Sequence, residues 1–76
     1  MSTKVLNTEP LERAIQVAGS QSALARAINV RQGHVWHWLN KSKRVPAEYV
    51  IPIERATGGK VLRHELRPDL YPLDGA

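Results

Sequence analysis

The 76-residue sequence predicts an all-α fold, and three features of the chain support this prediction. Apolar residues recur three and four positions apart, which is typical of one face of a helix. Proline, serine and glycine stand where such segments begin and end. No pair of segments has the alternating pattern of a β-hairpin, and no internal repeat is present. We therefore expect one compact domain of five short helices.

The first two helices are predicted from their boundaries and their apolar faces. The first begins near Thr8 or Glu9, with Pro10 in its first turn. Gly19 ends it. Its apolar face consists of Leu11, Ala14, Ile15 and Ala18. Ser20 is a favourable N-cap for the second helix. The inner face of that helix consists of Leu24, Ala25 and Ile28.

A third helix is predicted after "INVRQG", a stretch that interrupts the helical period. Asn29 tolerates a left-handed backbone and is a plausible end for the second helix. The third helix then runs from Gln32 to Leu39 or Asn40, and "KSKR" forms a loop behind it.

A fourth helix begins at Pro46 and ends at "TGG". We expect Pro52 to kink or split this helix, because proline lacks an N–H and its ring clashes with the preceding turn. A short fifth helix is expected in "VLRHEL". We expect residues 1–8 to form a flexible arm, residues 9–67 to form the folded domain and residues 68–76 to form an extended tail.

The distribution of charge indicates a polyanionic partner. The formal net charge is +4, and no acidic residue occurs between positions 13 and 47. The basic residues of this segment are Arg13, Arg26, Arg31, Lys41, Lys43 and Arg44. Phosphates attract such a segment, and binding releases counterions. An ordinary solvated basic surface is the alternative explanation.

Residues 20–40 have the pattern of a helix-turn-helix, in which a tight turn of three or four residues joins two short helices. Ala25 falls where the two helices would cross, and only a small side chain fits there. Val30 lies in the turn and would fill the core. Val35 and Trp38 would anchor the inner face of the third helix, and Leu39 extends that face.

With that face buried, helical geometry directs four residues outward into the major groove of DNA: Gln32, Gly33, Trp36 and His37. The amide of Gln32 can pair with N6 and N7 of adenine, and Gly33 permits a close approach. His37 can donate to guanine or to a phosphate. Trp36 has three open roles: packing on thymine methyls or sugar edges, burial in a partner subunit, or contact with the neighbouring loop.

Phosphate contacts are expected from the end of the third helix and the loop behind it. Asn40 closes the helix, and the loop carries Lys41, Lys43 and Arg44. Contacts of this kind position a protein on the duplex without selecting a sequence.

Two segments resemble a known family. They are "GSQSALARAINVRQGHVWHWLN" and "RVPAEYVIPIERATGGKVLRHELRPDLYP". Over about residues 11–72 the chain resembles the Cro/cI-like helix-turn-helix regulators of lambdoid prophages. Within these it is most similar to the YdaS-type subgroup of Cro-like repressors or antitoxins. The helix-turn-helix is moderately specific by itself, and the second segment strengthens the resemblance.

The resemblance implies a five-helix fold like that of the lambda repressor, and a protein that binds palindromic operator DNA as a homodimer. The absence of cysteine suits a reducing cytoplasm, where we expect the protein to act. It also implies that Gln21 bonds a phosphate and braces Gln32, and that Asn40 contacts a phosphate. The alternative within this subgroup is an antitoxin that binds a toxin protein and regulates its own operon. A nonspecific nucleic-acid binder with stacked aromatic rings is a weaker third hypothesis.

This chain departs from the family pattern at two positions. Arg31 stands where relatives have a Ser or Thr cap on the third helix. We expect a loss of about 1 kcal/mol of capping and the gain of a phosphate or guanine contact. Trp36 stands where relatives have a small polar residue, which predicts an operator unlike theirs.

Other kinds of site have little support. His34 and His37 are three positions apart, but no cysteine and no nearby acid completes a zinc site. The stretch "ATGGK" lacks the spacing of a phosphate-binding loop. No catalytic triad or carboxylate pair stands out, and no apolar run is long enough for a membrane span. We expect neither an enzyme, nor a cofactor, nor a metal, nor a membrane partner.

Overall fold

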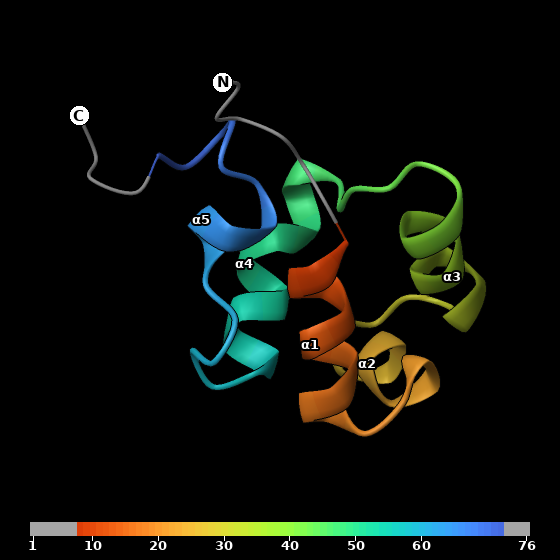
Figure 1. The fold of residues 1–76 in the computed structure, drawn as a ribbon. Helices are drawn as coiled ribbons and strands as arrows, with labels where there is room; N and C mark the ends of the chain where they lie inside the picture. Colours follow the sequence, from red (N-terminus) through yellow and green to blue (C-terminus); the bar gives the residue numbers. More distant parts are fainter. Residues whose placement is uncertain (1–7, 73–76) are drawn as a thin grey trace.

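The computed structural model describes residues 8–72, which form five helices and no strand. In chain order the helices are α1 (Glu9–Ala18), α2 (Gln21–Ala27), α3 (Gln32–Asn40), α4 (Ala47–Ala56) and α5 (Arg63–Leu66). α2 packs against α1 and α3, and α5 packs against α1 and α4. α3 and α5 therefore lie at opposite edges of the molecule (Figure 1). The predicted all-α class is confirmed, and most of the predicted N-terminal arm lies outside the described residues.

The helix starts follow the local signals in the sequence. Pro10 lies in the first turn of α1, where a missing N–H costs nothing. The Ser20 hydroxyl oxygen accepts a hydrogen bond from the Ala23 N–H at 3.0 Å and caps α2 as predicted. α3 begins at Gln32, also as predicted.

Two helices end in the same hydrogen-bonded turn. Asn29 follows α2 with φ 63°, and the Val30 N–H donates to the Ala25 carbonyl at 2.9 Å. Gly58 and Gly59 follow α4 with φ 64° and 84° and close the equivalent bonds. This arrangement needs a left-handed residue, which explains asparagine in one case and glycine in the other. The glycines are helix terminators, as expected.

The core lies between the helices and holds the apolar faces predicted for them. Its buried side chains are Leu11, Ala14, Leu24, Ala25, Ile28, Val35, Trp38, Val45, Val50, Ile53, Val61 and Leu66. The ring of Trp38 lies 5.2 Å from that of Tyr49, centroid to centroid, and joins α3 to α4. Val30 and Leu39 pack on the same core, as predicted for the turn and for the inner face of α3.

The predicted split of the fourth helix is wrong. α4 continues from Ala47 to Ala56 with Pro52 inside it. Val50 and Ile53 flank the proline and are both completely buried. Their burial outweighs the hydrogen bond that proline cannot make to Glu48, an exposed residue of the first turn.

The first part of the predicted tail is a turn rather than an extended chain. The N–H groups of Leu70 and Tyr71 both donate to the Arg67 carbonyl, at 3.0 and 2.9 Å. Tyr71 packs against the core. The last four residues of the predicted tail lie outside the described part of the chain.

Candidate nucleic-acid interface

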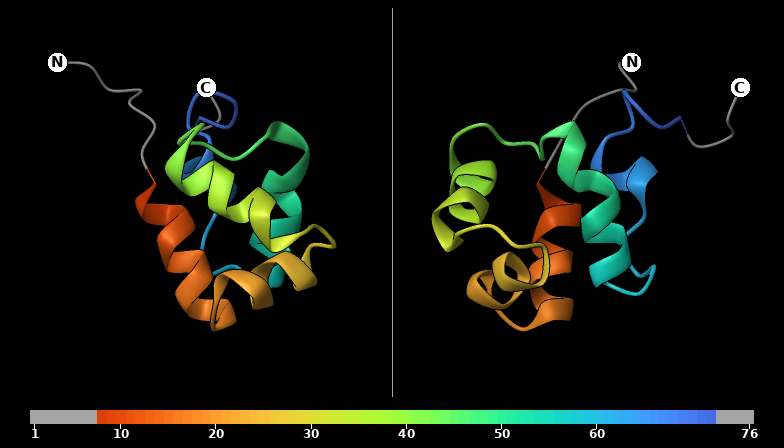
Figure 2. Two further views of the ribbon diagram at one scale, coloured as in Figure 1. Left: turned by 90° about the vertical axis from the view of Figure 1, so that its right-hand side faces the viewer. Right: turned by 180° about the vertical axis from the view of Figure 1, so that it is seen from behind.

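α3 presents one face to the core and the other to solvent. Figure 2 shows it crossing the front of the molecule in the left view. Val35 is completely buried and Trp38 is 5% exposed. The exposed residues include all four predicted base contacts: Gln32, Gly33, Trp36 and His37. The predicted division of α3 into two faces is confirmed, and the base contacts themselves stay predictions.

A hydrogen bond joins the two glutamines that begin α2 and α3. Gln32 Nε2 donates to Gln21 Oε1 at 2.6 Å, which is the brace that the family resemblance implies. Gln32 keeps one N–H and its carbonyl oxygen, the two groups that pair with adenine. Gln21 keeps both of its N–H donors, which suit a phosphate. The bond therefore orients Gln32 without using the atoms that would contact a base.

Gly33 leaves open space on the outward face of α3. A Cβ built at this position meets no atom within 4 Å. Glycine in a helix costs about 0.5–1 kcal/mol relative to alanine. Packing within the described residues does not require glycine here, so the room favours an external surface that approaches the helix closely.

Trp36 is 44% exposed and lies near the end of α3. The Lys41 ammonium lies 6.0 Å from the centroid of its ring. Asn40 Nδ2 donates to the Trp36 carbonyl oxygen at 3.1 Å and keeps a second N–H. Of the three open roles for Trp36, contact with the neighbouring loop is present through Lys41.

The start of α3 has a partial cap that the sequence analysis missed. The Arg31 side chain makes no capping bond, as expected. His34 Nδ1 instead accepts a hydrogen bond from the Arg31 N–H at 3.3 Å. The His34 ring also lies 6.5 Å from that of Trp38. The signal was the position of His34 three residues after the N-cap, where a side-chain acceptor can bond back.

No group of three potential metal ligands occurs within residues 8–72. His34 is engaged in the partial cap, and His37 lies on the exposed face of α3.

Basic residues flank α3 in sequence, one directly before it and three directly after it. None of the four exposed cations beside the helix forms a salt bridge to an acid within residues 8–72: Arg31, Lys41, Lys43 and Arg44. Lys43 has φ 61°, and Ser42 Oγ donates to the Arg44 carbonyl at 3.0 Å. This cationic rim adjoins the exposed face of α3, which is where a phosphate backbone would run on either side of a groove.

Arg13 does not belong to this rim, although the sequence analysis counted it with the basic segment. Its guanidinium bonds Glu9 and Glu65, each at 2.8 Å. These hydrogen bonds raise the pKa of Arg13, the one to Glu9 most strongly, and the same bond lowers the pKa of Glu9. Arg13 therefore joins α1 to α5 instead of facing a nucleic acid.

Arg67 holds the far end of the loop that follows α3. Its Nη1 donates to the Val45 carbonyl at 2.8 Å, and its side chain also pairs with Asp69 at 2.8 Å. The hydrogen bond to Asp69 raises the pKa of Arg67 and lowers that of Asp69. The side chain is only 11% exposed, so this contact fixes the loop against the turn after α5.

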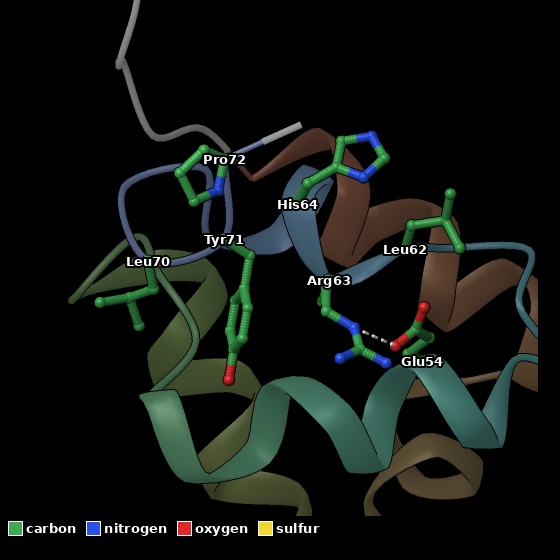
Figure 3. A pocket seen from close by; sticks show the side chains of 7 residues that line it. All are labelled: Glu54, Leu62, Arg63, His64, Leu70, Tyr71 and Pro72. Atoms are coloured by element: carbon green, nitrogen blue, oxygen red, sulfur yellow. Dashed lines mark hydrogen bonds and ion pairs between the residues drawn. The ribbon is translucent and has the colours of Figure 1, made fainter. Parts of the chain in front are cut away.

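A cleft of about 390 Å³ opens beside α5, at the edge of the molecule away from α3 (Figures 1 and 3). Arg63 lies within it, paired with Glu54 at 2.8 Å and 5.8 Å from the ring centroid of Tyr71. Its other lining residues are Leu62, His64, Leu70 and Pro72.

Within residues 8–72, no helix has the length and apolar character needed to cross a membrane.

Comparisons with known proteins agree with the fold. A solved structure of the Cro protein from the prophage element Xfaso 1 of Xylella fastidiosa strain Ann-1 superposes with a TM-score of 0.80. Its sequence is 45% identical, and the match covers 84% of this chain and 97% of that one. The Cro-like resemblance stated from the sequence is confirmed.

Sequence comparison gives the same family. The YdaS protein of Escherichia coli strain K12, whose name provisionally assigns it to the transcriptional regulators, is 46% identical over 59 residues. That match covers 78% of this chain and 60% of the relative's length. Residues 11–73 match the family described as bacterial toxin YdaS. Since this match spans most of the chain and the Escherichia coli protein is so similar, the chain belongs to the YdaS family.

Proposed function

We propose that this protein is a sequence-specific DNA-binding transcriptional regulator, a repressor of the prophage Cro type. The observation that carries the proposal is the hydrogen bond between Gln21 and Gln32, which leaves an adenine-pairing amide exposed at the start of α3. The cationic rim, whose members form no ion pair within the described part of the chain, supports it. The names of the Escherichia coli and Xylella relatives favour the same function.

In the proposed mechanism α3 enters the major groove. Gln32 pairs with adenine, and Gly33 lets the helix approach the base edges. His37 donates to guanine or to a phosphate. The remaining contacts are to phosphates and come from Gln21, Arg31, Asn40, Lys41, Lys43 and Arg44. Two copies of the chain would occupy palindromic half-sites about 34 Å apart, and the bound dimer would block transcription sterically.

A gel-shift titration with the region upstream of the gene tests the base contact. Gln32→Ala should weaken binding by about 1–3 kcal/mol and relax the sequence preference at one base pair. Gln16→Ala is a matched control, because Gln16 is an exposed glutamine on α1, outside the helix-turn-helix. Undiminished binding by Gln32→Ala would refute the docking of α3.

The salt dependence of the same titration tests the rim. Lys43→Gln should weaken binding to all sequences alike and reduce the slope of log K against log salt by about one. Arg63→Gln removes a cation from the opposite edge of the molecule and should leave the slope unchanged. Equal slopes for wild type and Lys43→Gln would exclude Lys43 from the interface.

The second candidate function is that of an antitoxin that binds a toxin protein and uses DNA binding to regulate its own operon. The cleft beside α5 favours it, because it lies away from α3 and leaves room for a protein while DNA is bound. The family description names a toxin, which fits a role in such a pair. A co-transcribed partner gene and a recovered complex with its product would support this function, and a pull-down without any protein partner would argue against it.

A further inference from the structure

Exposure of the large apolar side chain of Trp36 to water is unfavourable, and this side chain does not belong to the core of the fold. Its side chain is 44% exposed, whereas Trp38, two residues later, is 5% exposed. Trp36 lies one helical turn after Gln32, so both side chains occupy the same face of α3. A large apolar side chain is thus exposed directly beside the amide that we propose to pair with adenine.

The Trp36 indole has a cation beside it, since the Lys41 ammonium lies 6.0 Å from the centroid of its ring. The Asn40 amide bonds the backbone carbonyl of Trp36 at 3.1 Å and so stabilises the end of the helix rather than the ring. A cation over an indole attracts it electrostatically, so Lys41 restrains the ring while its ammonium stays free to meet a phosphate. The indole is therefore held between the base-contacting start of α3 and the cationic rim.

The chemistry of the major groove decides what such a ring can recognise. Among the four bases, only thymine presents a methyl group, at C5, on its major-groove edge, beside the donors and acceptors that the bases offer there. An indole face pressed against a polar edge would bury donors or acceptors without partners, which is unfavourable. Against a methyl group it would bury apolar surface on both sides.

We propose that Trp36 is a specificity-determining residue that recognises the C5-methyl group of a thymine. The pitch of a helix is about 5.4 Å and base pairs are stacked about 3.4 Å apart, so this thymine lies one or two base pairs from the adenine paired with Gln32. Lys41 is a positioning residue for the ring. This inference rests on the proposed DNA-binding function and adds a base that the glutamine pair does not explain.

The test first selects binding sites from random duplexes with the full-length chain at one fixed salt concentration. Each thymine of the selected site is then replaced by deoxyuridine, which removes only the methyl group. At one thymine near the Gln32-dependent adenine, affinity should fall about fourfold, as expected for one buried methyl. A duplex with 5-methylcytosine in place of that thymine should bind the protein more tightly than a duplex with cytosine there, because 5-methylcytosine restores the methyl group.

Trp36→Ser supplies the matched comparison. Since Trp36 is on the surface, the variant should fold, and circular dichroism checks this. The affinity of Trp36→Ser should be the same for duplexes with thymine and with deoxyuridine at that position. The binding site selected by the variant should no longer specify this thymine, but it should still specify the adenine that pairs with Gln32. Lys41→Met should reduce the wild-type response to the methyl, and Lys41→Arg should keep it.

The outcomes separate the two proposals. If wild-type affinity is the same for thymine and deoxyuridine at every position of a selected site, methyl recognition is wrong and specific DNA binding still stands. If no site is selected and all duplexes bind equally, the proposed function itself is wrong, and the role of Trp36 with it. The deoxyuridine series uses the wild-type protein, so it decides the question even if a variant fails to fold.

Discussion

Three arginines near α5 each hold a carboxylate oxygen at 2.8 Å, whereas Arg31, Lys41, Lys43 and Arg44 beside α3 pair with no acid within residues 8–72. The paired cations are Arg13, Arg63 and Arg67. Their partners include Glu54, Glu65 and Asp69, so three of the acids that follow the basic segment in sequence are neutralised on the α5 side. Folding thus separates the charges by edge of the molecule.

The polar side chains at the two edges of the molecule differ in their bonding partners. On the α5 side, guanidinium groups join segments that are distant in sequence, as Arg67 does with Val45. On the α3 side, the bonds between side chains leave donors and acceptors unused, as the Gln21–Gln32 pair does. The first edge stabilises the fold, and the second keeps hydrogen-bonding capacity and positive charge available for a polyanion.

The largest expected effect comes from the two tryptophans of α3. Trp38→Ala should lower the free energy of unfolding by about 3–5 kcal/mol, because it empties a core position. Trp36→Ala leaves the core intact and removes a half-exposed side chain with its contact to Lys41, so it should cost about 1 kcal/mol. Urea denaturation measures both. Similar losses would mean that the exposed face of α3 also supports the fold, and the contrast between the two edges would fail.

Gly33→Ala should separate stability from binding. The added Cβ meets no atom within 4 Å, so the variant should gain about 0.5 kcal/mol in free energy of unfolding through helix propensity. The same methyl would stand between α3 and the base edges, so affinity for DNA should fall. Thermal unfolding and a gel-shift titration on one preparation measure both quantities. A variant that is more stable and binds as tightly as wild type would show that close approach at Gly33 is not needed.

The smallest expected effect is the loss of stability at low pH that comes from the ion pair next to α5. Arg67 lowers the pKa of Asp69 from its ordinary value of 3.8. The folded pKa lies below the unfolded one, so the ion pair stabilises the protein above about pH 4 and is lost as the pH falls through the folded pKa. Asp69→Asn should therefore cost at most about 1 kcal/mol near neutral pH and close to nothing in strong acid.

Denaturant titrations at several pH values measure this difference. Arg44→Gln is the contrasting variant, since Arg44 pairs with no acid among the described residues and its loss should not change the free energy of unfolding over the same range. If Arg44→Gln lowered the free energy of unfolding near neutral pH but not in acid, Arg44 would form an ion pair on the α3 side. The contrast in charge pairing between the two edges would then be wrong.

Sequence reasoning predicted the features that depend on nearby residues. The cap at Ser20, the left-handed Asn29 and the two faces of α3 are each specified within a turn or two of helix. Periodicity was sufficient to separate Trp36 from Trp38, because the period of a helix fixes which side chains share a face. The brace between Gln21 and Gln32 came from the family resemblance and is confirmed.

The errors concern residues whose role depends on distant parts of the chain. Arg13 was counted as a basic surface residue, but its partner Glu65 lies 52 positions away. Pro52 was expected to kink or split its helix, and the split is wrong because core packing on both sides of it keeps α4 continuous. One further omission is local: the bond from the Arg31 N–H to His34 Nδ1 lies within the first turn of α3, whose start was predicted correctly.

By itself the sequence determined the all-α class, the boundaries of the first three helices and the outward position of Gln32, Gly33, Trp36 and His37. These follow from propensity, capping and periodicity, which act over a few residues. Only the tertiary structure decided which charges are neutralised and which remain available, because ion pairs form between segments that folding brings together. The cationic rim beside α3 therefore comes from the basic segment after Arg13 has been withdrawn to α5.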